Sequence, residues 1–197
     1  MHLCLVCSSS FSQTKGGIEN YNYLRKGEEY VWMPVVHFQT RSKIYTEIRY
    51  NYEEKQTLSL FGGRTFSGGR NLLFSFTPMA GLSSGRFSGV SLATRAEAEW
   101  NNIYASMETQ YSMATNKNRT NFFFNWSELE YYVMKNLFAG LTVQYTRQQG
   151  INELQPGFAA GLEFKNMSIP VYIFNPFRNS SYLVVGLNYE YNLKKKK

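Results

Sequence analysis

Hydrophobic and polar residues alternate along most of this chain, and the longest regular example lies between Asn121 and Arg147. The stretch predicts two long strands joined by a tight turn at 134–136. The second strand places its apolar side chains on one face (Leu137, Ala139, Leu141, Val143, Tyr145) and mostly polar ones on the other. A period of two residues indicates a half-apolar strand.

The first strand of this pair is less regular. Its apolar residues change parity halfway, from one set (Phe122, Phe124, Trp126) to another (Leu129, Tyr131, Val133) that lies opposite Glu128 and Glu130. A β-bulge inserts one extra residue and so shifts the parity of everything after it. We therefore expect a bulge near Ser127.

The same pattern predicts eleven strands in total, with no segment left for a helix between them. Besides the pair above, they cover Tyr30–Gln39, Lys43–Glu53, Thr57–Phe66, Asn71–Leu82, Arg86–Trp100, Asn102–Met113, Gly157–Lys165, Met167–Phe174 and Tyr182–Leu193. Consecutive strands joined by short connections favour an antiparallel meander.

Short and longer connections alternate along the chain, and the longest is expected at Arg147–Pro156. Outer-membrane barrels have short periplasmic turns and longer external loops. If the C-terminus is periplasmic, the chain must cross once before Tyr30, so residues 13–29 form an extra strand or a lumen plug. We predict an all-β, up-and-down transmembrane β-barrel over 30–193, with twelve strands and ten as the alternative.

A soluble barrel of the lipocalin kind also alternates, with its apolar face inside. Two features favour the membrane barrel. Aromatic residues end the apolar face of many strands, as in an interfacial girdle (Tyr50, Tyr52, Trp100, Tyr111, Tyr145, Tyr189, Tyr191). The last strand also carries Gly186, Tyr189, Tyr191 and Leu193 in a spacing that resembles the signal read by the outer-membrane assembly machinery.

Composition narrows the class further. No run of eighteen apolar residues occurs, which excludes a transmembrane helix. The net charge of +7 and a pI near 9.3 suggest nucleic acid, but no basic helix or recognition motif supports such a partner. We assign the excess charge to solvated loops and to the lysine tail at 194–197.

The N-terminus resembles the end of a secretory signal peptide, which we place at 1–12, without the usual basic start. Both cysteines, Cys4 and Cys7, fall inside it, so the mature chain has no disulfide and no cysteine-based metal site. Acylation at Cys7 is the weaker alternative, because bulky Val6 precedes it.

Several blocks resemble an uncharacterised family of small bacterial outer-membrane β-barrel proteins. They are EIRYNYE at 47–53, TPMAG at 77–81, FFNWSEL at 123–129, QYTR at 144–147 and FNP at 174–176. The resemblance covers the chain from about Val35 onward. It implies a shared barrel and no particular chemistry.

In this barrel the polar face lines the lumen. The expected lumen charge network consists of Glu47, Arg49, Glu53, Arg95, Glu97, Glu99, Glu108, Glu163 and Glu190, with Asn51, Gln110, Gln144 and Lys165 beside it. The structural interpretation, that inward charges pair and fill a small barrel, is favoured. The functional interpretation is a narrow, cation-preferring channel, since acids outnumber bases on this face.

Enzymatic barrels need a histidine paired with Ser, Asp or Glu near the external side. The mature chain has only His37, two residues before a predicted periplasmic turn, so we expect a filler or turn-facing residue and no enzyme. The glycine-rich pieces at 61–64 and 67–70 precede no helix, so turn chemistry explains them better than phosphate binding. We expect no catalytic residue, no metal and no cofactor.

The leading hypothesis is therefore a protein of the cell outer membrane, structural or channel-forming, whose partners are outer-membrane lipid and the barrel assembly machinery. An accessory subunit that docks on a larger outer-membrane or secretion complex is the alternative, based on the Arg147–Pro156 loop and the lysine tail. A lipid-modifying or proteolytic barrel enzyme is a distant third.

Overall fold

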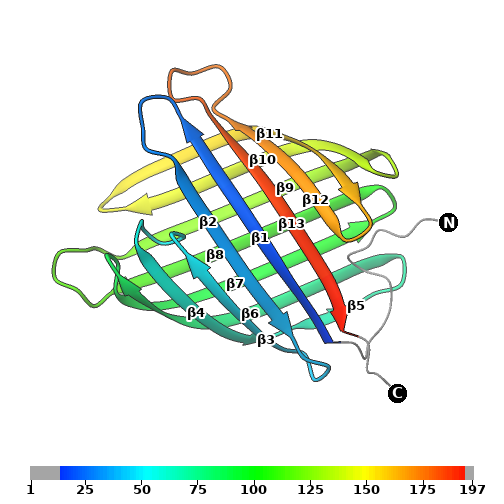
Figure 1. Ribbon diagram of the computed structural model, residues 1–197, viewed down its shortest axis with the longest axis horizontal. Helices are drawn as coiled ribbons and strands as arrows, with labels where there is room; N and C mark the ends of the chain where they lie inside the picture. Colours follow the sequence, from blue (N-terminus) through cyan, green and yellow to red (C-terminus); the bar gives the residue numbers. More distant parts are fainter. Residues whose placement is uncertain (1–13, 194–197) are drawn as a thin grey trace.

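The computed structural model describes residues 14–193 of the chain as a β-barrel (Figure 1). Its strands are β1 (Thr14–Arg25), β2 (Val31–Gln39), β3 (Ile44–Tyr50), β4 (Thr57–Arg64), β5 (Phe66–Gly68), β6 (Leu72–Gly85), β7 (Gly89–Trp100), β8 (Ile103–Ala114), β9 (Phe122–Met134), β10 (Leu137–Gln148), β11 (Ile151–Phe164), β12 (Met167–Phe174) and β13 (Tyr182–Leu193). The predicted signal peptide and lysine tail lie outside the described residues.

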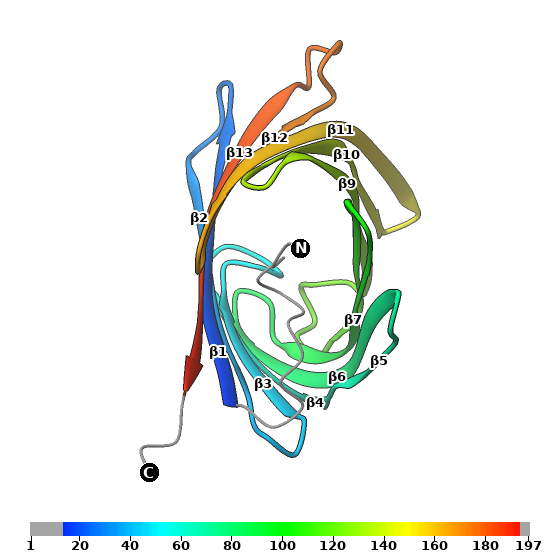
Figure 2. The same cartoon turned by 90° about the vertical axis from the view of Figure 1, so that its right-hand side faces the viewer.

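The sheet closes on itself, as the ring in Figure 2 shows. Consecutive strands pair antiparallel, β1 pairs with both β2 and β13, and β4 pairs with β6. The short β5 continues β4 along β6, so the two share one position in the ring. The barrel therefore has twelve positions, and the predicted fold and strand number are confirmed. Closure leaves no open sheet edge around the ring of described strands.

Residues 14–25 occupy the twelfth position as β1 and do not thread the lumen. Every residue of this strand has a partner on β13, from Thr14 opposite Leu193 to Arg25 opposite Tyr182. β1, the first described strand, therefore closes the barrel by pairing with β13, the last described strand.

The exterior of the barrel is apolar, as the alternation requires. Large side chains such as Leu82 (65% exposed) and Leu92 (61%) point outward from the middle strands. Trp100, Tyr111 and Tyr189 are also exposed on this outer surface. A closed barrel with such an exterior is the architecture of proteins buried in lipid.

No helix in the described part of the chain is long and apolar enough to cross a membrane.

The two ends of the barrel differ in their connections. Short turns (40–43, 101–102, 135–136, 165–166) join strands at the end where β1 begins and β13 finishes. Longer loops (26–30, 51–56, 115–121, 175–181) lie at the opposite end. We call these the turn end and the loop end.

The prediction of a long loop at Arg147–Pro156 is wrong. β10 runs to Gln148 and β11 starts at Ile151, so the connection is a two-residue turn. Gln149 (φ 54°) and Gly150 (φ 79°) both have positive φ, as a type I′ hairpin turn requires. The polar residues that suggested a loop instead form the start of β11, which has only β10 as a neighbour up to Pro156 among the described strands.

The prediction of a bulge near Ser127 is also wrong. β9 alternates without interruption, and its inward face carries Phe122 and Trp126 as well as Glu130. The register shift lies at Leu137/Phe138, beside the turn into β10. The change of parity in the sequence reflects a change in the lumen, from aromatic toward the loop end to acidic toward the turn end.

Two further boundaries differ from the prediction. β6 extends to Gly85 and β7 begins at Gly89, so Arg86 lies in the loop between them. β3 ends at Tyr50, and the residues predicted to continue it belong to the loop at 51–56.

Candidate functional site

The centre of the lumen contains a fully buried arginine. Arg49 and Glu47 lie two residues apart on β3, so both point inward, and they form an ion pair with each side chain 1% exposed or less. Arg49 also pairs with Glu108 of β8 (2.7 Å) and donates to Gln110 Oε1 (2.9 Å). The guanidinium therefore connects β3 to β8 across the lumen.

Two rings cover the same guanidinium. Its central carbon lies 4.2 Å from the ring centroid of Tyr52 and 4.4 Å from that of Phe61. Contacts of this kind combine cation–π attraction with exclusion of water. Arg49 is thus held by carboxylates at its edge and by rings on its faces.

A second arginine continues the network toward β1. Arg95 of β7 pairs with Glu19 (3.0 Å) and lies 3.7 Å from Glu108, so Glu108 joins both arginines. Glu19 also lies 3.4 Å from Nδ1 of His37, whose ring stacks on Tyr45. Side chains from β1, β2, β3, β7 and β8 thus form one connected charged group, which we call the central network (Glu19, His37, Glu47, Arg49, Arg95, Glu108).

Aromatic side chains fill the lumen beside this network. Trp126 of β9 packs against Tyr21, Tyr172 and Phe174, with ring centroids 5.1–6.0 Å apart, and its indole donates to Thr142 (2.9 Å). Phe174 is completely buried and stacks on Tyr182. These rings reach inward from β1, β9, β12 and β13 and fill part of the lumen beside the central network.

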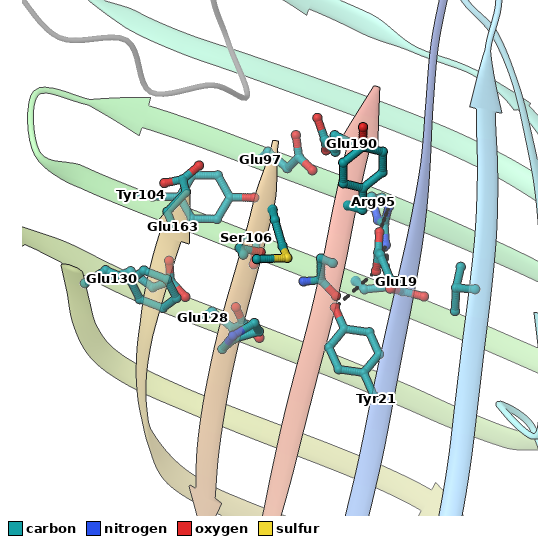
Figure 3. Close-up of a pocket in the computed structure, with 18 of the residues that line it drawn as sticks. Glu19, Tyr21, Arg95, Glu97, Tyr104, Ser106, Glu128, Glu130, Glu163 and Glu190 are labelled. Carbon is teal, nitrogen blue, oxygen red and sulfur yellow. Dashed lines mark hydrogen bonds and ion pairs between the residues drawn. The ribbon is translucent and has the colours of Figure 1, made fainter. Parts of the chain in front are cut away.

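A cavity of about 190 Å³ lies on the turn-end side of the network. Its charged lining comprises nine glutamates (Glu19, Glu47, Glu97, Glu99, Glu108, Glu128, Glu130, Glu163, Glu190) and two bases (Arg95, Lys165). Figure 3 shows carboxylates from β7, β9, β11 and β13 gathered around this space. We call it the acidic cavity.

The rim at the turn end has a different charge. A neighbouring cavity of about 210 Å³ shares Arg95, Glu97 and Glu190 with the acidic cavity, and Lys15, Arg41 and Lys43 also line it. The surplus of carboxylates is therefore confined to the interior and does not extend over the whole turn end.

A third cavity, of about 310 Å³, opens at the loop end. Aromatic and amide side chains line much of it, including Tyr23, Phe122, Phe124 and Gln144. Gln144 is buried and bonded to the hydroxyls of Tyr23 and Tyr182. We call this space the outer vestibule. Among the described residues, Tyr52 alone lines both the vestibule and the acidic cavity.

The structure places the predicted lumen residues in two groups. Glu47, Arg49, Arg95 and Glu108 belong to the central network, and Glu53 accepts hydrogen bonds from Ser59 (2.5 Å) and Gln110 (3.0 Å) at its edge. The others face the acidic cavity (Glu97, Glu99, Glu163, Glu190). Within residues 14–193, no ion pair is found for Glu97, Glu163 or Glu190.

One predicted orientation is wrong. Asn51 adopts a left-handed backbone (φ 61°), and Tyr52, which follows it, turns into the lumen and lines both the acidic cavity and the outer vestibule, which Asn51 also lines. Tyr52 is therefore not part of the exterior girdle. Strict alternation cannot continue through a residue in this conformation.

Sequence reasoning missed three lumen acids. Glu19 was not assigned because residues 14–25 show no clean alternation. Glu128 and Glu130 were placed on the charged face of their strand but not in the network, since the supposed bulge obscured which face points inward. Uniform alternation along β9 was the signal that could have identified the last two.

The residues of the proposed assembly signal occupy the end of β13. Gly186 faces inward, where a Cβ would lie 2.6 Å from Cγ of Pro170. Tyr189 and Tyr191 stack on each other, and Leu193 is the last residue of the strand. Recognition by the assembly machinery stays a prediction.

No group of three or more His, Cys, Asp or Glu side chains able to hold a metal ion is found between residues 14 and 193.

Comparison with known proteins places the fold among porins. The chain is similar to KdgM porin in complex with disordered oligogalacturonate, with a TM-score of 0.64 and 13% identity over 88% of this chain and 98% of that one. It is also similar to NanC porin, with a TM-score of 0.56 and 6% identity over 89% of this chain and 100% of that one. No protein-family model and no curated protein matches the chain. At these identities the likeness establishes the fold, that of outer-membrane barrels.

Proposed function

We propose that the protein is an outer-membrane barrel whose narrow lumen admits small cations in preference to anions. The observation that carries the proposal is the acidic cavity, with nine glutamates against two bases. Carboxylates in a low-dielectric wall attract cations and repel anions more strongly than they would in water.

The cross-section sets the size of the permeant species. The central network and the rings around Trp126 separate the acidic cavity from the outer vestibule. A path between such side chains suits hydrated monovalent ions or small organic cations. It does not suit the wide aqueous flow of larger porins.

We do not propose acidic saccharides as the permeant species, although the fold is similar to that of a porin solved with one. The similar KdgM porin was solved in complex with oligogalacturonate, a chain of carboxylated sugars. In the present chain carboxylates dominate the lumen, and they would repel such a ligand. The proposal therefore gives this barrel a permeant species of the opposite charge.

The test is ion selectivity in planar bilayers. Reversal potentials across a KCl gradient should show a permeability ratio of potassium to chloride clearly above 1. In the variant Glu97→Gln the ratio should fall toward 1, because a carboxylate without an ion pair among the described residues leaves the acidic cavity. Lys117→Gln is the control, since Lys117 is an exposed residue of the 115–121 loop and lines none of the three cavities. Anion selectivity of the unchanged protein would contradict the proposal.

We propose docking on a larger membrane complex as a second candidate, and one feature favours it. β11 extends beyond its neighbour β12, with which it pairs only from Gly157 onward, and Ile151 at the tip of the β10–β11 hairpin is 70% exposed. An apolar tip beyond the barrel rim is a suitable contact for a partner protein. A photo-crosslinker at Ile151 should capture one specific protein in intact cells, and the same probe at exposed Phe177 is the control. Equal labelling from both positions would remove this candidate.

A further inference from the structure

The loop between β3 and β4, residues 51–56, folds into the lumen and does not extend away from the barrel. Both ends of the loop carry left-handed residues, Asn51 (φ 61°) and Gln56 (φ 59°). Asn51 fixes the bend, because its side chain donates to Trp32 O (2.8 Å) and accepts from Gln56 N (2.7 Å). In Figure 2 this cyan segment projects over the opening of the ring.

Tyr52 is the residue that the bend sends inward. Its hydroxyl donates to Glu108 Oε1 (2.7 Å), its face covers the Arg49 guanidinium, and its edge meets Phe124 (centroids 5.8 Å apart). Phe124 and Glu108 belong to β9 and β8, which lie several positions from β3 around the ring. The ring of Tyr52 therefore spans the lumen between the acidic cavity and the outer vestibule.

Salt bridges tie the rest of the loop across the mouth of the barrel. Glu54 forms a bidentate pair with Arg119 of the 115–121 loop (2.5 and 2.6 Å). Lys55 pairs with Glu29 of the 26–30 loop (3.0 Å). Because the second pair is exposed, it contributes little, whereas the bidentate pair gives a defined geometry.

We propose that loop 51–56 is a lid that closes the lumen and that Tyr52 is the residue that seals it. The inference rests on the proposed channel function and adds how that channel is regulated. When the lid moves away, Glu108 and Arg49 both lose their contact with Tyr52, and the acidic cavity joins the outer vestibule. Small cations then pass from the vestibule to the acidic cavity.

Single-channel recording of purified, refolded protein tests the lid. Tyr52→Ala should raise single-channel conductance at least several-fold over the unchanged protein, because the ring between the two cavities is gone. Tyr52→Phe keeps the ring and loses only the bond to Glu108, so it should open more often at nearly unchanged conductance. Tyr50→Ala is the matched control, since Tyr50 lies two residues away on the exterior and should behave like the unchanged protein.

A second variant tests the lid without altering its sealing residue. Glu54→Gln removes the ionic pair with Arg119 and should increase the fraction of time spent open. Heat-modifiable migration on gels shows for each variant that the barrel has folded. If folded Tyr52→Ala and folded Glu54→Gln both conduct like the unchanged protein, the lid is refuted, as it is if Tyr50→Ala gives the same increase as Tyr52→Ala.

The two proposals fail in different ways. Larger currents in Tyr52→Ala that prefer chloride would support the lid and refute the cation preference. Cation-selective currents that are identical in the unchanged protein and in folded Tyr52→Ala would refute the lid and support the cation preference. Absence of current from every folded variant would refute the lid, because removing the seal must open a path.

Discussion

Individual residues decide how the lumen is filled. Arg49 is the most constrained of them, because two carboxylates, one amide and two rings contact its fully buried side chain. Arg95 likewise pairs with partly buried carboxylates, those of Glu19 and Glu108, but 18% of its own side chain is exposed. Partners left behind by a lost arginine would be uncompensated buried charges.

Replacing Arg49 with Met should therefore destabilise the barrel by about 3–5 kcal/mol, the usual cost of removing one partner from a buried ion pair. Arg95→Met should cost less, because lumen water can screen Glu19. Urea unfolding in lipid vesicles measures both differences. Exposed Arg147 supplies the control variant Arg147→Met, which should leave the midpoint unchanged. Equal midpoints for all three variants would show that water, not the arginines, stabilises the glutamates.

Among the described strands, β1 is the one that closes the barrel, because it pairs with both β2 and β13. It pairs with β13, the last described strand, and it brings Glu19 to the central network and Tyr21 to Trp126. A barrel without it would have two open edges, on β2 and β13, with unpaired backbone groups in lipid.

Deleting residues 14–25 should consequently abolish folding and not simply widen the pore. The deleted protein is expected to show no heat-modifiable band after refolding into detergent. Shortening the 175–181 loop is the control. This loop connects β12 and β13 beyond the ends of the strands, so its shortening should leave the band intact. A folded, conducting deletion variant would mean that β2 and β13 can pair directly in a smaller ring.

At the scale of the whole molecule, the exterior determines where the protein resides. Its outward side chains are apolar over the strands, and aromatic residues such as Trp100 and Tyr189 lie among them near the strand ends. We expect the mature protein in outer-membrane fractions, and we expect its mobility on gels to change when the sample is boiled. Recovery as a soluble monomer without detergent would contradict a lipid-facing exterior.

The alternation of apolar and polar residues is enough to predict most strands, their antiparallel order and which face of most strands points outward. β6 and β7 show why: Leu82 and Leu92 face lipid, whereas Thr77 and Arg95 face inward. Facing depends only on local backbone geometry, since consecutive residues of a strand point to opposite sides. The alternation of short and longer connections then favours a twelve-stranded ring, but it leaves residues 13–29 as either the twelfth strand or a lumen plug.

The contacts inside the lumen depend on how distant parts of the chain come together. The left-handed bend at Asn51 reversed the parity of Tyr52, and a two-residue turn at 149–150 replaced the expected long loop. The central network joins residues as distant in sequence as Glu19 and Arg95, and no local pattern reports that they meet. Alternation tells which side chains point inward, but which of them touch depends on closure and register, because these bring strands from opposite parts of the chain to the same height in the ring.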